Sequence, residues 1–337
     1  MPKVLSLPPP SHIQLMFRPA LWQALCEGFE VIENTEARHL TPADVTEHLG
    51  DCEAIFTGWG AKAFSREILE AAPKLKIVAH TAGSVKGLFS ADVVREVLVP
   101  RGMVVFSGND AMAINVAEAT IGYMIMAARR WTEHIETFHR QHHGSRDLPR
   151  SGQFLTGATV GLVSASKVAR HVLRVLQPFD CKILIYDPFL TPETARGLGA
   201  ELVGLDDLFA QSNVASVHAP ALPSTDKMIG AAQLGKLRDG AVFVNTARGA
   251  VVDHAALLNE CRTGRIVAVL DVTEPEPLPP ESEFWNLPNV ILTPHIAGCG
   301  AYGYFGIGQT AVNALRDCFA GKPVAGAVPL DRWDTLA

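Results

Sequence analysis

Short apolar runs bounded by Gly, Pro or Asp recur along this chain, and a stretch with helical spacing follows most of them. Strands that alternate with helices pair in parallel and form an α/β fold. In the second half the runs are almost continuously apolar, as in strands that helices cover on both faces. We therefore expect a doubly wound parallel sheet with strands at Ala158–Val163, Lys182–Tyr186, Val214–His218, Ala241–Asn245, Ile266–Leu270 and Val290–Thr293.

The first third of the chain shows the same alternation. We expect helices at Pro19–Glu27 and Ala63–Ala71, the latter with Ser65 as a plausible cap. A chain of 337 residues is too long for one ordinary core and suits two domains. The sequence thus predicts a second α/β domain, with strands at Val4–Leu7, Ala54–Thr57, Lys76–His80 and Val104–Phe106.

Three further segments complete the expected order of elements. A long helix from about 111 to 134 is apolar on most sides, which is typical of a helix buried between domains or at a subunit interface. The polar segment Glu136–Gly152 is expected to be a surface connection. Within it His139, His142 and His143 lack a carboxylate or cysteine partner at ligand spacing, so we expect no metal site there. A final helix is expected at Ala311–Phe319.

Composition narrows the class of protein. The formal net charge is −6 and no Lys/Arg stripe occurs, which disfavours nucleic acid or an anionic membrane as the main partner. No uninterrupted apolar run approaches the roughly 18 residues of a membrane span, and the N-terminus does not resemble a signal peptide. Six single cysteines without a C-x-x-C pair indicate reduced thiols. We expect a cytoplasmic protein, although a processed secreted form is compatible with the same features.

The segment Thr159–Ala169 lies where a dinucleotide-binding fold places its first strand, its turn and the start of a helix. The usual G-x-G-x-x-G fingerprint is replaced by Ser164, Ser166 and Ala169. A helix N-terminus still presents free N–H groups to a phosphate, and serine hydroxyls can donate hydrogen bonds as well. The turn therefore remains compatible with dinucleotide binding, although the fingerprint motif is incomplete.

Asp187 ends the next predicted strand, 23 positions after Ser164. A carboxylate at this point accepts hydrogen bonds from the adenosine ribose, and it would repel a 2′-phosphate. No arginine follows it directly, so the sequence favours NAD over NADP. The alternative is that Asp187 is only a turn residue before Pro188.

Five longer motifs follow one another between Leu75 and Gly298, and over this range the chain resembles the D-isomer-specific 2-hydroxyacid dehydrogenases. The resemblance implies two Rossmann-like domains, with an NAD-binding domain at 108–297 inserted into a substrate (catalytic) domain formed by 1–107 and 298–337. The motifs are NVAEAT (Asn115–Thr120), SVHAPALPST (Ser216–Thr225), FVNTARGAVVD (Phe243–Asp253), VLDVTEPEPLP (Val269–Pro279) and LPNVILTPHIAG (Leu287–Gly298).

The resemblance assigns catalytic roles to Arg248, Glu276 and His295. Arg248 would clamp the substrate carboxylate with its planar guanidinium. His295 would exchange a proton with the keto oxygen, and Glu276, rather than the nearby Glu274, would orient its imidazole. Taken singly, each has an ordinary alternative: a loop cap, a buried strand-end histidine and a solvated charge.

The same resemblance assigns binding residues. Backbone N–H groups of Gly83, Ser84 and Val85 would hold the substrate carboxylate, and the next residue is Lys86 where relatives often carry Asp. Lys86 would make a surface ion pair or favour a more anionic substrate. Cofactor contacts beyond Ser164, Ser166 and Asp187 are implied for Lys167, Val168, His218, Pro220, Thr225, Ala247 and Asp271.

The segment after His295, GCGAYGYFGIG, departs from the family pattern. Its five glycines cost about 1 kcal/mol each in a helix relative to alanine, so we expect a mobile flap rather than a firm helix. Tyr302, Tyr304, Phe305 and Trp59 would then shape the substrate pocket or, alternatively, pack at the domain edge.

These features predict reversible hydride transfer between NADH and a small 2-keto acid, giving the D-2-hydroxy acid, in a homodimer. The main rival is a catalytically idle NAD(H)-sensing binding protein on the same scaffold, like the dehydrogenase-like transcriptional corepressors. A formate dehydrogenase is a third candidate, disfavoured because that group carries Gln at the position of Glu276.

Overall fold

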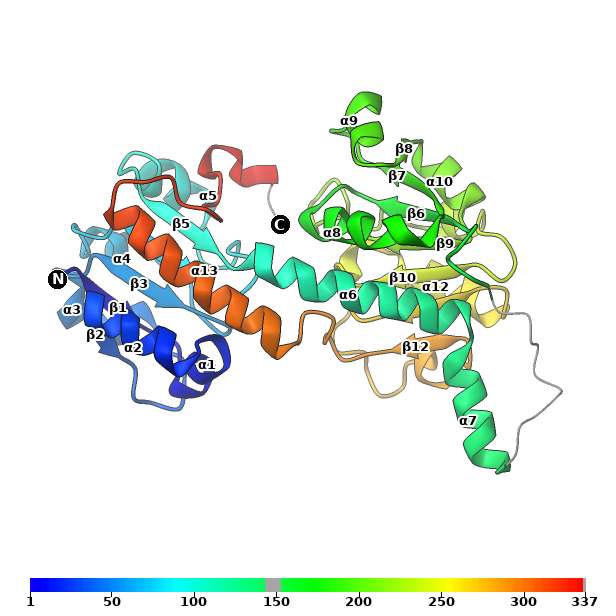
Figure 1. The fold of residues 1–337 in the computed structure, drawn as a ribbon, viewed down its shortest axis with the longest axis horizontal. Helices are drawn as coiled ribbons and strands as arrows, with labels where there is room; N and C mark the ends of the chain where they lie inside the picture. The colour runs from blue at the N-terminus through cyan, green and yellow to red at the C-terminus, as the bar shows by residue number, and fades with distance from the viewer. Residues whose placement is uncertain (143–152, 336–337) are drawn as a thin grey trace. The chain divides into compact units, whose positions relative to one another are not determined.

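The chain folds into two compact units, each built on its own parallel sheet (Figure 1). The computed structural model describes residues 1–142 and 153–335. Unit 1 comprises Met1–Met112 and Cys299–Ala337, and unit 2 comprises Ala113–Gly298. The expected α/β class with two parallel sheets is confirmed.

Unit 1 contains a five-stranded sheet in the order β2-β1-β3-β4-β5, in which every neighbouring pair is parallel. The order reverses direction between β1 and β3. The four predicted strands are present, and β2 was missed because both its ends are exposed and its middle only half-buried. The strands are β1 (Lys3–Ser6), β2 (Glu30–Glu33), β3 (Ala54–Thr57), β4 (Ile77–His80) and β5 (Val104–Ser107).

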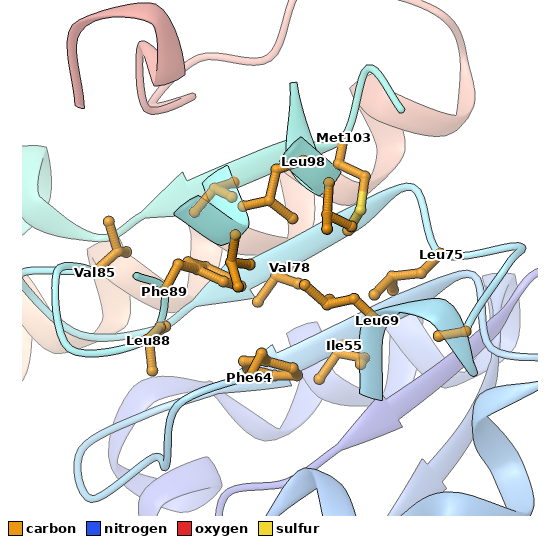
Figure 2. Packing of buried hydrophobic residues seen from close by; sticks show 14 of the residues in the cluster. Ile55, Phe64, Leu69, Leu75, Val78, Val85, Leu88, Phe89, Leu98 and Met103 are labelled. Carbon is orange, nitrogen blue, oxygen red and sulfur yellow. The ribbon is translucent and has the colours of Figure 1, made fainter. Parts of the chain in front are cut away.

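Helices cover both faces of this sheet because its strands alternate side chains between two apolar cores. Ile55 and Val78 face one core, where Leu69, Leu88 and Phe89 pack against them (Figure 2). Phe56 and Ala79 face the other core, with residues of the C-terminal helix. The helices are α1 (Pro10–Met16), α2 (Pro19–Gly28), α3 (Thr46–Leu49), α4 (Arg66–Glu70), α5 (Ala91–Val93) and α13 (Ala301–Phe319). Ser65 caps α4 as predicted, accepting the Ile68 N–H.

Unit 2 contains a seven-stranded parallel sheet in the order β8-β7-β6-β9-β10-β11-β12. This is a doubly wound sheet, and its order reverses between β6 and β9. The six predicted strands are present, and the two-residue edge strand β8 was missed. The strands are β6 (Thr159–Val163), β7 (Lys182–Tyr186), β8 (Glu201–Leu202), β9 (Val214–Val217), β10 (Val242–Asn245), β11 (Val267–Leu270) and β12 (Val290–Leu292).

In the part of the chain that the structure describes, seven α-helices belong wholly or partly to unit 2. The first of them, α6, begins in unit 1 and enters unit 2 after Met112. Except for α7, which has no buried residue, these helices contribute side chains to two cores, one on each side of the seven-stranded sheet. The helices are α6 (Asn109–Ala128), α7 (Trp131–Gln141), α8 (Lys167–Leu176), α9 (Pro192–Gly197), α10 (Leu205–Gln211), α11 (Ala231–Leu234) and α12 (His254–Arg262).

The single long helix expected near 111–134 is in fact two helices. Arg130 adopts a left-handed backbone conformation, with φ of 52°, and this ends the run between α6 and α7. By length and composition α6 passes the test for a membrane span, which core helices of soluble proteins also pass. Met124 and Ala127 of α6 are fully buried in a unit 2 core, so α6 is a core helix. The expected surface connection begins as α7, and His143 lies outside the described residues.

The glycine-rich segment also differs from the expectation, because it is helical from Ala301 onward. We predicted a flap because glycine lowers helix propensity. The sequence alone does not show that glycine is needed here for close helix packing. A Cβ at Gly308 would lie 2.0 Å from the Met16 carbonyl oxygen, so glycine lets α1 approach α13. Tyr304 is buried within unit 1, against Trp59, while the side chain of Tyr302 lies outside the described part.

We expect Gly308→Ala to destabilise the protein. The substitution gains about 1 kcal/mol of helix propensity, but a methyl group against a backbone oxygen costs roughly 1–3 kcal/mol through displacement of packed elements. Gly306→Ala is the matched control, since its Cβ would meet only Ala111 Cβ at 3.5 Å and should leave stability equal or higher. Urea unfolding of the three proteins tests this, and equal stabilisation by both substitutions would contradict the close helix approach.

Candidate active site

Glu276 and His295 form a hydrogen-bonded pair in the loops that follow β11 and β12. Glu276 Oε1 lies 2.6 Å from His295 Nδ1, and both side chains are partly exposed. The carboxylate can only accept, so His295 Nδ1 carries the hydrogen. His295 Nε2 is then the ring atom left to exchange a proton with a ligand, as a general acid and base requires.

The loop that carries His295 is held by the buried carboxylate of Asp271. Its two oxygens accept the backbone N–H groups of Ile296 and Ala297, each at 2.9 Å, and the Thr293 hydroxyl at 2.6 Å. The His295 N–H donates to the Asp271 carbonyl at 2.9 Å, and His295 has a left-handed φ of 54°. Asp271 therefore fixes the backbone on both sides of the imidazole.

Arg248 follows β10, and the amide of Asn245 ties down the backbone around it. The Asn245 side chain donates to the Arg248 carbonyl at 3.0 Å and accepts the Ala247 N–H at 3.0 Å. At Gly249 a Cβ would lie 2.1 Å from the Thr273 carbonyl oxygen, so this turn packs directly on the chain after β11. The Arg248 side chain is exposed and donates to the Ala247 carbonyl at 2.6 Å.

Arg248, Glu276 and His295 therefore share one edge of the seven-stranded sheet. They follow β10, β11 and β12, which are neighbours in the sheet and parallel. Glu276 and His295 are in direct contact, while Arg248 contacts its own turn. An exposed guanidinium and a carboxylate–imidazole pair at the same sheet edge can bind an anion and move a proton.

The turn after β6 is closed by Asp187. Ser164, at the first fingerprint position, has a left-handed φ of 78°. Its hydroxyl donates to Asp187 Oδ2 at 3.2 Å, and the Ala165 N–H donates to the same oxygen at 2.8 Å. The other carboxylate oxygen accepts the Phe189 N–H at 2.8 Å. Asp187 is thus a turn residue by its contacts, and its oxygens keep further lone pairs for a ligand.

At the point where the sheet order reverses, α8 begins and β9 ends. Ser166 caps α8, and Lys167 and Val168 are its first residues, so their backbone N–H groups belong to the first turn of the helix. His218, one residue beyond β9, is buried, and neither ring nitrogen has a hydrogen-bond partner within the described structure. Burial lowers the pKa of His218 to about 3, so the ring is neutral.

These residues fit a dinucleotide. A helix N-terminus suits the pyrophosphate, Asp187 suits a ribose, and a buried imidazole without a partner calls for a polar ligand atom. The predicted contact residue Thr225 uses its hydroxyl within its own turn, donating to the Pro220 carbonyl at 2.5 Å and accepting the Leu222 N–H at 2.9 Å. Thr225 thereby shapes the loop that follows β9.

The predicted carboxylate-binding turn, Gly83–Val85, follows β4 in unit 1. The Val85 side chain is buried in the core shown in Figure 2, and the Ser107 hydroxyl donates to the Gly83 carbonyl at 2.7 Å. Lys86 has no carboxylate partner among the described ion pairs, and its preference for an anionic substrate stays a prediction. Its ammonium donates to the Trp333 carbonyl and lies 4.9 Å from the centre of the Trp333 ring, which ties it to the C-terminal segment.

Several residues that support the site are visible only in the structure. Asn115 donates to the Gly298 carbonyl at 2.9 Å, and the Tyr123 hydroxyl donates to the Thr293 hydroxyl at 3.1 Å. Asn115 begins a family motif, so that signal was available. The Tyr123 contact joins residues 170 positions apart, and no local pattern indicates it.

Comparison with known proteins gives a consistent family. The model of the D-isomer specific 2-hydroxyacid dehydrogenase NAD binding domain matches residues 121–297. A D-3-phosphoglycerate dehydrogenase of Archaeoglobus fulgidus is 32% identical over 265 residues, 78% of this chain and 49% of that protein. A glyoxylate reductase of Korarchaeum cryptofilum is 33% identical over 257 residues, 75% of each protein. The chain thus spans about half the length of the phosphoglycerate dehydrogenases it matches.

Comparison with solved structures indicates the same family. The crystal structure of an NADPH-dependent glyoxylate/hydroxypyruvate reductase from Sinorhizobium meliloti, in complex with citrate, superposes with a TM-score of 0.76. It is 28% identical, and the match covers 98% of each chain.

The left-handed conformation of Ser164 leads to a stability prediction. A residue with a Cβ costs about 1 kcal/mol or more at such a φ, so Ser164→Gly should be more stable than Ser164→Ala by about 1 kcal/mol. Both variants lose the hydroxyl, so the comparison isolates the backbone. At the exposed α8 residue Arg174 the order should reverse, with Ala more stable than Gly by about 1 kcal/mol. Thermal unfolding measures both pairs, and the same order at both positions would refute the assigned turn geometry.

Proposed function

The chain belongs to the D-isomer specific 2-hydroxyacid dehydrogenase family, and we propose that it reduces small 2-keto acids to D-2-hydroxy acids with NADH, reversibly. The observation that carries this proposal is the 2.6 Å contact between Glu276 and His295 at the sheet edge that also bears Arg248. General acid–base catalysis is a direct use for such a pair, and this favours the enzyme over a sensing protein.

In the proposed reaction His295 Nε2 gives its proton to the keto oxygen, and Glu276 orients the imidazole by accepting the Nδ1–H. Arg248 binds the substrate carboxylate through two parallel N–H groups. NADH, when bound, supplies the hydride to the keto carbon. In unit 1, the backbone N–H groups of Gly83, Ser84 and Val85 are proposed as carboxylate-binding groups.

We further propose that residues 108–297 form the NAD-binding domain and that the two end segments, 1–107 and 298–337, form the substrate domain. Asp187 supports NAD over NADP, because a 2′-phosphate would meet a carboxylate with no arginine directly after it. The proposed cofactor contacts are Ser164, Ser166, Lys167 and Val168 for the pyrophosphate, Asp187 for the adenosine ribose, His218, Pro220 and Thr225 for the second ribose, and Ala247 and Asp271 for the nicotinamide.

The decisive experiment follows NADH and NADPH absorbance with glyoxylate, pyruvate, hydroxypyruvate and phenylpyruvate. We expect oxidation of NADH with at least one acid. His295→Ala should lower kcat by about 10²–10⁴-fold, the usual contribution of a general acid, with little change in the NADH dissociation constant measured by fluorescence.

His48→Ala is the control, since this partly exposed histidine lies in unit 1 outside the proposed machinery. NADH binding without turnover of any acid would favour the NAD(H)-sensing alternative. Turnover by the His295→Ala variant at the wild-type rate would show that another group donates the proton.

We also propose that the protein is a cytoplasmic homodimer and that α7 contributes to the interface. All six cysteines are free, as expected in a reducing compartment. None of the α7 residues is buried, and Trp131, Ile135 and Phe138 lie on one face of the helix with 47%, 56% and 55% of their surface exposed. An exposed apolar stripe of this kind is typical of a protein–protein contact.

Placing a charge in this stripe tests the dimer. We expect Ile135→Lys to halve the mass measured by sedimentation equilibrium, because an ammonium would be buried without a partner. Phe189→Lys is the control, since Phe189 is apolar and 79% exposed but lies after β7. A monomeric wild-type protein, or a dimer that survives the α7 substitution, would contradict the proposed interface.

A further inference from the structure

We propose that the carboxyl edge of the five-stranded sheet carries an uncharged aromatic subsite, and that Trp59 there selects 2-keto acids with a planar, apolar side chain. This inference rests on the proposed function and names the substrate class within it. The substrate would be an aryl-substituted 2-keto acid rather than a phosphorylated one.

The position of the subsite follows from strand order. In an open parallel sheet, ligands bind beyond the carboxyl ends of the strands where the order reverses, and in unit 1 this point lies between β1 and β3. His12, in α1, follows β1, and Trp59 follows β3. Ser6 ends β1 at the same edge, where its hydroxyl is buried and lacks a hydrogen-bond partner in the described structure. Such a buried hydroxyl indicates a place where a ligand atom is expected.

Trp59 is held in a fixed orientation although 43% of its surface is exposed. Its ring makes edge contacts with the rings of His12, at 5.3 Å, and Tyr304, at 5.4 Å. The backbone before it is fixed as well, because the Gly58 N–H donates to His39 Nε2 at 3.1 Å. A Cβ at Gly58 would lie 2.4 Å from the His12 ring, so the imidazole packs directly on this backbone. A rigid, exposed indole offers a planar ligand a stacking surface at little entropic cost.

The hydrogen bonds around His12 define its protonation. The Thr81 hydroxyl donates its one hydrogen to the Thr57 carbonyl at 2.8 Å, so its oxygen accepts from His12 Nε2–H, also at 2.8 Å. His12 Nδ1 is therefore a lone-pair acceptor. Burial lowers the pKa of His12 to about 4, which keeps the ring neutral at physiological pH.

The other two histidines at this edge are neutral for similar reasons. His39 Nε2 accepts the Gly58 N–H, so its Nδ1–H donates to the Leu40 carbonyl at 2.7 Å, and burial lowers its pKa. Burial also lowers the pKa of His80, which bonds to the Thr57 hydroxyl, to about 4. A phosphate or carboxylate tail would thus meet neutral imidazole rings instead of positive charges.

Cations that follow these strands in the chain could alter this conclusion, and two of them, Arg38 and Arg66, are paired with carboxylates. Lys86 is engaged with Trp333, and the Arg18 guanidinium lies 5.1 Å from the centre of the Phe305 ring. Lys62 is exposed and stands three residues after Trp59, so it is the cation that an anionic substrate would use. The experiment therefore includes a Lys62 variant.

The test compares kcat/KM for phenylpyruvate, glyoxylate and 3-phosphohydroxypyruvate. We expect phenylpyruvate to be the best substrate of the three. Trp59→Ala should lower the ratio of kcat/KM for phenylpyruvate to that for glyoxylate at least tenfold, mainly through KM, and Trp59→Phe should restore most of it. Val99→Ala, which also removes an exposed apolar side chain but lies just before β5 at the opposite sheet edge, should leave the ratio unchanged.

Two results would overturn the subsite. One is that Trp59→Ala leaves the ratio of kcat/KM for phenylpyruvate to kcat/KM for glyoxylate unchanged. The other is a preference for 3-phosphohydroxypyruvate that Lys62→Met abolishes, which would show an anionic subsite.

If no acid is turned over, the proposed function fails, and phenylpyruvate binding measured by calorimetry then decides the subsite separately. A dissociation constant raised at least tenfold by Trp59→Ala supports it. Equal affinity of the two proteins, or the lack of binding to the wild-type protein, refutes it.

Discussion

Parallel strand pairing is the constraint on which both units depend. Because every strand in a sheet runs in the same direction, each loop that follows a strand emerges at one edge. Arg248, Glu276 and His295 span 47 positions of the chain, yet β10, β11 and β12 deliver them to neighbouring places. The same rule gathers His12, Trp59 and His80 at the edge of the other sheet. Within each unit, polar residues that are far apart in the sequence therefore lie at the same edge of one sheet.

The sequence predicted most strands correctly because a covered parallel strand is a short, nearly continuous apolar run, a signal that needs no tertiary information. It missed β2, whose side chains are at most half-buried, and the two-residue β8. It also joined α6 to α7, since no glycine or proline marks the break at Arg130. The role of Gly308 could not be predicted either, because it depends on a close contact with Met16, nearly 300 positions away.

The candidate site residues could be predicted from the sequence, but the contacts that fix their positions could not. The family motifs indicated Arg248, Glu276 and His295, and the structure adds the direct contact between the last two. The motif implied that Asp271 lies beside the nicotinamide, whereas its visible contacts are to the loop of His295. A buried carboxylate that accepts several hydrogen bonds is rigid, so the orientation of the imidazole depends on a residue that need not touch the substrate.

The altered phosphate turn shows how a lost glycine can be compensated. A serine in the left-handed region is strained, but a short polar side chain can offset part of the cost by bonding locally. Here the Ser164 hydroxyl bonds to Asp187, so the carboxylate that closes the turn is also the one proposed to bind the ribose. Turn geometry and cofactor recognition are thereby linked through one side chain. Under the proposed function, a ribose hydroxyl would share either carboxylate oxygen of Asp187 with internal donors, two at Oδ2 and one at Oδ1.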